Sequence, residues 1–238
     1  TGNGSLNLNV DYTNITSPIA VSSTQNIGLI CNTLTSGTLD VTGVTFPTSY
    51  SVTSTGTETS AGTETSAGGI VGKMDEGSKL IINNFPSTVS VTTGADNAGG
   101  IVGYLQNATV EVKGNGNDNN NNNKTLKSTI TKNNKNDSAG NAGGLIGKAE
   151  QPTFSLEDGV TLTVKTECTA EGENSNAGGL FGYLLTTDNE ISFEGNMKTT
   201  SSTIKASAGN AGGLVGMLIN SSKDKTTTVG MSNDENVY

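Results

Sequence analysis

The chain has 238 residues, of which 32% are hydrophobic and 4% aromatic, with neither His nor Trp among them. A compact globule of this length would be short of core-forming side chains, while the regular placement of Val, Ile and Thr argues against disorder. The net charge of −9 disfavours binding to nucleic acid or to an anionic membrane surface, and two cysteines without any histidine are too few ligands for a zinc site.

Residues 1–24 are expected to form an N-terminal cap or a first, irregular coil. A degenerate copy of the repeat that dominates the chain follows at residues 25–32, where Ile27 and Cys31 take the places of two glycines. Residues 25–238 are predicted to form one elongated domain built from such repeats.

Five regular copies of the motif Ala-Gly-Gly-φ-φ-Gly come next, where φ is an apolar residue. Counted from Ile27 and then from the first glycine of each regular copy, the intervals are 41, 31, 44, 35 and 34 residues. The two long intervals contain a duplicated hexapeptide, at 57–62 and 63–68, and an asparagine tract, at 119–123 within the polar stretch 114–124. Insertions are tolerated where the chain bulges into solvent, so both stretches are predicted to be outside loops. The structural glycines of the five copies are Gly68, Gly69, Gly72, Gly99, Gly100, Gly103, Gly143, Gly144, Gly147, Gly178, Gly179, Gly182, Gly212, Gly213 and Gly216.

Between the motif copies, short runs alternate apolar residues with Thr, Ser, Glu or Lys. This period of two predicts strands with one buried face, at residues 88–92, 109–113, 129–132, 161–165 and 203–205. The predicted fold is all-β: a parallel β-helix or β-solenoid of about six coils with a repeat of ~35 residues. In that fold equivalent glycines lie in one column, where they permit positive φ and close backbone approach, and the next Leu or Ile joins an inner aliphatic column.

The Gly-Leu/Ile-φ-Gly core of the motif resembles the GLUG-motif repeats of bacterial cell-surface and secreted proteins. It is carried by residues 69–72, 100–103, 144–147, 179–182 and 213–216, and the resemblance covers roughly residues 25–220. It implies an extracellular location, on a bacterial surface or secreted. That family has no common catalytic site, so the resemblance says little about a ligand.

The predicted function is that of an extracellular structural or adhesive module, not an enzyme. Two alternatives stay open: a subunit that stacks end to end into an extracellular filament, and a polysaccharide-binding or polysaccharide-cleaving β-helix. The expected partner is a protein or glycan on a host or neighbouring cell, or further copies of the chain joined end to end. No nucleic acid and no membrane insertion of this segment are expected.

Two groups of residues deserve a chemical interpretation. Acidic pairs at 75–76, 157–158 and 188–190 stand beside turn residues, where carboxylates usually belong to solvated loops. One aligned motif position holds a variable, partly polar set, which predicts an outward column and a candidate contact surface. That column comprises Lys73, Tyr104, Lys148, Tyr183 and Met217.

No catalytic, cofactor or metal site is predicted, although structural calcium is an alternative, since Asp and Asn recur before the glycine pair. The residues concerned are Asp96, Asn97, Asp137 and 171–174. Turn chemistry is the favoured interpretation, because Asn tolerates the left-handed conformation. Cys31 and Cys168 are predicted to be unbridged, because three or more coils separate them by more than ~14 Å, beyond the ~7 Å between Cα atoms that a disulfide allows.

Overall fold

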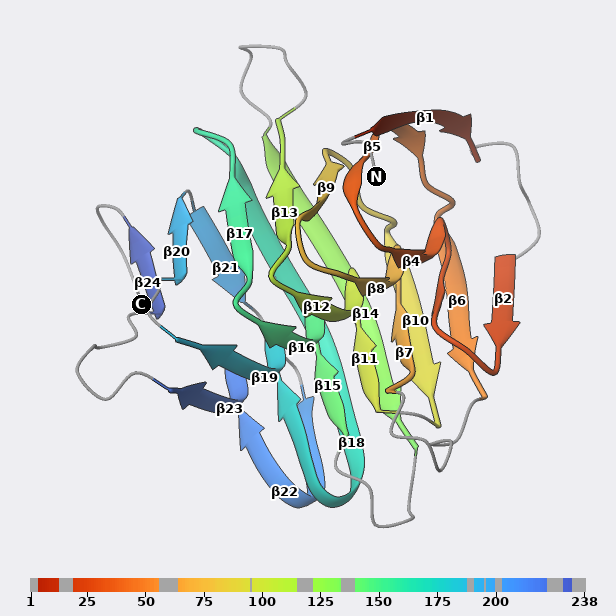
Figure 1. Cartoon of the computed structure of the whole chain (residues 1–238). Helices are drawn as coiled ribbons and strands as arrows, with labels where there is room; N and C mark the ends of the chain where they lie inside the picture. Colours follow the sequence, from red (N-terminus) through yellow and green to blue (C-terminus); the bar gives the residue numbers. More distant parts are fainter. Residues whose placement is uncertain are drawn as a thin grey trace.

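The structure is a computed structural model that describes residues 4–12, 19–55, 64–94, 96–114, 122–133, 140–187, 191–194, 196–199, 203–221 and 229–232, with the backbone alone at 191–194, 196 and 229–232. Within these residues the chain forms 24 strands and no helix, and therefore no helix long and apolar enough to cross a membrane (Figure 1). Neighbouring strands are paired in parallel throughout the described sheets. The all-β prediction is confirmed.

The strands belong to three main sheets and one short pair. Sheet A has the order β1 (Ser5–Asp11), β5 (Gly37–Thr45), β9 (Ser78–Ile82), β13 (Thr109–Val112) and β17 (Thr153–Leu156). Sheet C has the order β23 (Val215–Asn220), β19 (Phe181–Thr186), β16 (Ile146–Glu150), β12 (Val102–Gln106), β8 (Val71–Met74) and β4 (Cys31–Leu34). The separate pair is β20 (Ile191–Glu194) with β24 (Val229–Ser232).

Sheet B contains two rows of strands that the long strand β18 (Thr161–Gly178) joins. The first row is β2 (Ile19–Ser23), β6 (Ser49–Ser54), β10 (Thr88–Thr93), β14 (Asn123–Lys132) and the first half of β18. The second row, from the end of β18 backwards, is β15 (Asn141–Gly143), β11 (Asn97–Gly99), β7 (Ser66–Gly68) and β3 (Ile27–Gly28). Both β21 (Asn196–Thr199) and β22 (Thr203–Gly212) also pair with β18.

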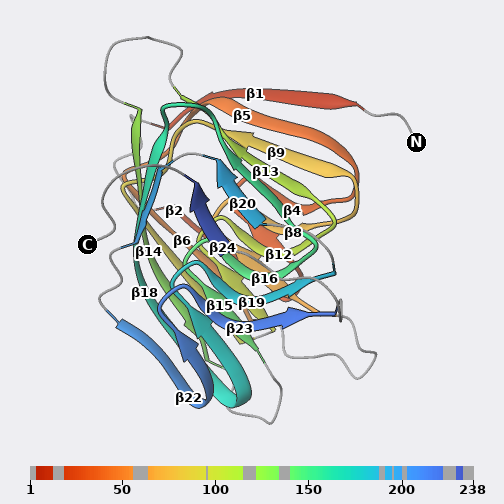
Figure 2. The ribbon, with the colours of Figure 1, turned by 90° about the vertical axis from the view of Figure 1, so that its left-hand side faces the viewer.

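The chain visits the sheets in a fixed order. It runs through sheet A, the two rows of sheet B and then sheet C, and it returns to sheet A beside the strand that it left. We call each such circuit a pass. Figure 2 shows the strands of successive passes, β1, β5, β9 and β13, lying side by side.

The core is made of side chains that occupy equivalent positions in successive passes. In sheet A, Leu39, Leu80, Val110 and Phe154 are paired in register and at most 2% exposed. In sheet B the same is true of Val52, Val91, Ile130 and Cys168. The Leu or Ile after the glycine pair is buried as predicted in four copies, at Ile70, Ile101, Leu145 and Leu180.

The predicted strands lie where the alternating runs are, in β10, β13, β14, β18 and β22, although β13 ends at Val112, one residue before the predicted end. Parts of the two predicted loops are strands instead. Residues 66–68 of the hexapeptide form β7, and Asn123 and Lys124 begin β14, because both segments pair with the neighbouring pass. Residues 56–63 and 115–121 lie outside the described residues. Residues 1–24, predicted as a cap or irregular coil, include β1 and β2, which pair with β5 and β6.

The alignment of the degenerate copy was wrong by one residue. Gly28 is paired with Gly68, and Ile27 with Ala67, so Ile27 holds the place of the motif alanine. Cys31 is paired with Val71 and is therefore an apolar motif residue. The glycines that this copy lacks are replaced by Leu29 and Asn32. The physical reason is close packing: a Cβ on Gly28 would lie 2.5 Å from the Cys31 carbonyl oxygen, so this position must be glycine.

Candidate functional site

The repeated glycines bring the second row of sheet B into direct contact with sheet C. The first glycines of the copies are paired in one row, Gly28, Gly68, Gly99, Gly143, Gly178 and Gly212. The third glycines face the preceding pass: a Cβ on Gly103 would lie 2.7 Å from the Gly72 carbonyl oxygen and 2.8 Å from the Ala67 nitrogen. Real Cβ atoms do not approach backbone this closely, so both rows require glycine. We call the two rows together the glycine seam.

Glycine is needed in the seam for space and not for a left-handed backbone. Among the described glycines only Gly37, Gly77, Gly159 and Gly172 have positive φ, and all four lie outside the motif. The prediction of positive φ at the motif glycines is therefore wrong, whereas that of close backbone approach is confirmed.

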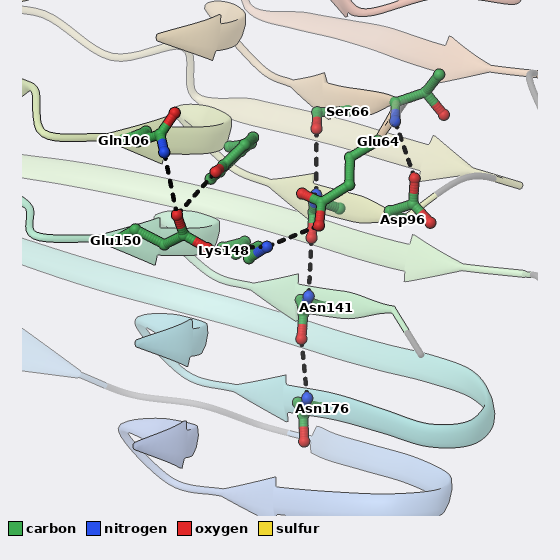
Figure 3. A network of polar contacts seen from close by, with 11 residues as sticks. Glu64, Ser66, Asp96, Gln106, Asn141, Lys148, Glu150 and Asn176 are labelled. Atoms are coloured by element: carbon green, nitrogen blue, oxygen red, sulfur yellow. Dashed lines mark hydrogen bonds and ion pairs between the residues drawn. The ribbon is translucent and has the colours of Figure 1, made fainter. Parts of the chain in front are cut away.

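A ladder of asparagine side chains runs beside the seam (Figure 3). Asn210, Asn176 and Asn141 each donate from Nδ2 to the Oδ1 atom of the ladder residue in the preceding pass, at 2.8 Å, the last acceptor being Asn97. Asn97 in turn donates to the Ser66 hydroxyl at 3.3 Å. Buried amides need such partners, and stacked parallel strands supply them in register.

The interpretation of Asn97 as a turn residue is wrong. All four ladder asparagines lie in strands, β11, β15, β18 and β22, and none of them has positive φ. Asn174, which the same interpretation covered, does have the left-handed backbone, with a φ of 56°. The sequence signal for the ladder was present, because the same residue precedes the Ala-Gly-Gly tripeptide in four copies.

The outward column of sheet C is a stack of alternating cations and rings. Lys73, Tyr104, Lys148, Tyr183 and Met217 are paired in register, as the alignment placed them. The Lys148 ammonium lies 4.9 Å from the ring centre of Tyr104 and 5.7 Å from that of Tyr183. Lys73 lies 5.6 Å from the Tyr104 ring. Tyr104 is only 7% exposed, so its ring is covered by cation–π contacts and offers little surface of its own.

Two carboxylates hold this column in place. Lys148 forms ion pairs with Glu64 at 2.7 Å and with Glu150 at 3.0 Å. The Tyr104 hydroxyl donates to Glu150 at 2.9 Å. Glu64 also accepts from Asn97 at 3.4 Å, so one carboxylate links the asparagine ladder to the outward column (Figure 3). Glu64 was missed in the sequence because it lies 84 residues from Lys148, in the duplicated hexapeptide that was predicted to be an outside loop.

The electrostatics fix the protonation of the column at neutral pH. Burial by itself lowers the pKa of Lys148, but hydrogen bonds and charge from Glu64 and Glu150 outweigh it and raise that pKa above its usual value. Burial, reinforced by the hydrogen bond to Glu150, raises the pKa of Tyr104 far above that of a free phenol. Burial also raises the pKa of Tyr183, against the opposing effect of Lys148. The lysine is therefore charged and both phenols are neutral.

Two of the three acidic pairs, at 75–76 and 157–158, lie at turns, as expected. Asp75 follows β8 and pairs with Lys73 at 2.9 Å, while Glu76 is exposed. Glu157 and Asp158 follow β17 and are exposed. Asp188 and Glu190 lie outside the described residues.

Two of the candidate calcium ligands, Asp96 and Asn97, form hydrogen bonds with other residues of the protein. Asp96 accepts from the Thr65 backbone at 2.9 Å, and Asn97 belongs to the ladder. Asp137 lies outside the described residues, among which no group of three or more acidic, Cys or His side chains could hold a metal ion. Both cysteines are free, as predicted, and burial raises the pKa of Cys168 to about 12.

Lys132 is a further residue that the composition did not single out. It is 0% exposed on the inward face of β14, and its ammonium donates to the Glu171 carbonyl oxygen at 2.9 Å and to the Ser175 hydroxyl at 3.4 Å. Exposed and buried residues alternate along β14, and this alternation places residue 132 on the inward face. The period of two in the sequence therefore indicated that Lys132 is buried. Lys132 satisfies polar groups at the corner between the two rows of sheet B.

Comparisons with protein-family models, with curated protein sequences and with solved structures give no match to this chain.

Proposed function

We propose that the chain is a parallel β-solenoid of about six coils, with a repeat of ~35 residues, and that it serves as a structural and adhesive module of an extracellular bacterial protein, without catalysis. Each pass is then one coil. The observation that carries the proposal is the register of the glycine seam and the asparagine ladder: one motif position meets the same position of the next copy from Gly68 to Gly212. A stack of this kind transmits load along its axis through backbone hydrogen bonds.

The resemblance of the motif core to GLUG repeats supports the extracellular location. Within the proposal the chain lies on a bacterial surface or is secreted, and its partner is a protein or glycan on a host or neighbouring cell. The resemblance points to no catalytic residues, which agrees with a structural role.

The contact surface in this proposal is the outward column of sheet C. The Lys73 and Asp75 side chains at its start are 27% and 30% exposed. Further along, Tyr183 and Met217 are half-buried and accessible from outside. A surface held by ion pairs and cation–π contacts keeps its shape, so binding loses little side-chain entropy.

The same contacts disfavour the polysaccharide alternative. Sugar binding commonly uses an open ring face, and Lys148 covers one face of Tyr104 and one face of Tyr183, while Lys73 also lies over the Tyr104 ring.

Adhesion of beads coated with the chain to bacterial and animal cells tests the proposal. The double variant Lys73→Ala/Tyr183→Ala is expected to lose at least about tenfold in adhesion, since a few central contacts dominate an interface. The matched control is Ser90→Ala/Thr129→Ala, which alters an outward column of sheet B. Failure of the unaltered chain to adhere to any cell, or equal loss in both variants, would contradict the adhesive role.

A further inference from the structure

The C-terminal end of the stack leaves the core open. Leu214 is 37% exposed and Leu218 is 44% exposed, whereas the equivalent residues of the preceding pass, Leu180 and Leu184, are at most 1% exposed. In the four preceding regular copies, where the next pass covers them, both positions are at most 1% exposed; in the first copy the equivalent Ile30 and Leu34 are half-buried. The aliphatic columns of the core therefore end at a surface that one more pass would bury.

Backbone groups at this end also lack the partners of earlier copies. The Gly179 amide donates to the Gly212 carbonyl oxygen at 3.3 Å, and the Leu180 and Phe181 amides donate to that of Leu214 at 2.8 and 3.1 Å. The equivalent amides of the last copy, those of Gly213, Leu214 and Val215, have no such acceptor in the described part of the chain. They point where the carbonyl groups of a following pass would lie.

The asparagine ladder ends with an open acceptor as well. Each ladder Oδ1 atom accepts from the asparagine of the following pass, as Asn176 does from Asn210. Among the described residues no group donates to Asn210 Oδ1. A following pass with asparagine at this position would extend the ladder by one bond.

The second glycine of the last copy is kept where nothing in the structure requires it. A Cβ on Gly69, Gly100 or Gly144 would collide with a carbonyl oxygen of the following copy. A Cβ on Gly213 would meet nothing within 4 Å. The chain also continues beyond this copy, because β24 pairs in parallel with β20.

The N-terminal end also exposes an apolar side chain, Leu6, which is 58% exposed, but it differs at the third glycine position of the motif. Third glycines face the preceding pass, and a Cβ on Gly147 would lie 2.6 Å from the Gly103 carbonyl oxygen. The first copy has Asn32 at this position. Cys31 pairs with Val71 and Thr33 pairs with Lys73, which places Asn32 opposite Gly72. A coil stacked before it in register would collide with the Asn32 side chain.

We infer that the C-terminal end binds one further coil of the same motif, with asparagine at the ladder position and glycine at the third position, and that the first coil of a second copy cannot serve as that coil. The inference rests on the proposed solenoid architecture. A coil can then be added to the C-terminal end of the stack but not to its N-terminal end. This disfavours the filament built from copies of this chain alone.

Hydrogen exchange on an extended chain tests this inference. In the extended chain a second copy of residues 157–186 follows Ser232, which completes the pass that β24 begins. The amides of Gly213, Leu214 and Val215 are expected to exchange rapidly in the original chain and at least about 100-fold more slowly in the extended one. The matched control carries Gly182→Asn in the added copy alone, which reproduces the residue at position 32, and its amides are expected to exchange as in the original chain.

The amides of Gly179, Leu180 and Phe181 serve as the reference within the same molecule. Rapid exchange at these three in the original chain would contradict the solenoid itself. If they are protected, two outcomes overturn the inference about the end: slow exchange at 213–215 in the original chain, or equal protection in the extended chain and its Gly182→Asn control.

Discussion

The second glycine of a motif copy faces a carbonyl group of the next copy at a separation that leaves no room for a methyl group. This contact recurs at Gly69, Gly100 and Gly144. Its partner is backbone and not a flexible side chain, so the neighbour cannot yield without shifting a whole strand.

Gly100→Ala and Gly213→Ala are a matched pair for this contact. We expect Gly100→Ala to lower the free energy of unfolding by at least about 2 kcal/mol, because overpacking against backbone forces strands apart. Gly213→Ala is expected to change it by less than about 0.5 kcal/mol, because its Cβ meets open space. Urea unfolding of the two variants measures the difference, and equal losses would contradict the role assigned to the contact.

The pKa values of the outward column predict a loss of stability in alkali. Burial raises the pKa of Tyr104, and the two glutamates raise that of Lys148, so the folded state holds protons that the unfolded state releases. The contribution of both groups is complete below pH ~10, near the ordinary pKa values of Tyr and Lys, and is lost as the pH rises through the raised values.

Thermal unfolding between pH 8 and 11 is the measurement for this prediction, with Lys148→Met and Tyr104→Phe as variants. Their stability is expected to fall less steeply above pH ~10 than that of the original chain, since each variant lacks one of the protons concerned. An identical slope in all three proteins would show that the column does not govern the alkaline response.

At the scale of the strands, the asparagine ladder connects β11, β15, β18 and β22. Asn141→Ala removes a buried donor and a buried acceptor at once, so Asn97 and Asn176 both lose a partner. We expect a loss of at least about 2 kcal/mol in unfolding free energy. Asn210→Ala, at the exposed end, is expected to cost about 0.5–1 kcal/mol. Denaturant titration would contradict the ladder if the two losses were the same.

Strands and their burial could be predicted from the sequence because they depend on local alternation. The run at 88–92 became β10, and the glycine spacing brought Gly99 beside Gly143. The one-residue error in the alignment of the first copy could not be avoided reliably from the sequence, since Leu29 and Asn32 replace two of its three motif glycines. The contact of Glu64 with Lys148 could not be predicted either, because it joins residues 84 positions apart through the stacking itself.

At the scale of the whole molecule, the two ends have different chemistry. The first copy carries Asn32 where later copies have glycine, and the last copy keeps Gly213 and exposes Leu214. The inferred one-way stacking gives an array of such modules a defined direction. Within the proposal above, that polarity disfavours a filament built from copies of this chain alone.

The most direct test of the account is the spacing of equivalent positions along the stack. Ala20, Ser51, Ser90, Thr129, Glu167 and Thr203 form one outward column of sheet B. Spin labels at cysteines introduced in pairs, Ala20→Cys with Glu167→Cys and Ala20→Cys with Thr203→Cys, report the two distances by pulsed electron resonance. The native cysteines are replaced by Cys31→Ser and Cys168→Ala.

Stacked parallel strands predict Cα separations of about 19 Å for the first pair and about 24 Å for the second, an increase of one strand spacing. Mean distances above about 35 Å, or a second distance no longer than the first, would contradict the stacking of equivalent residues along one axis.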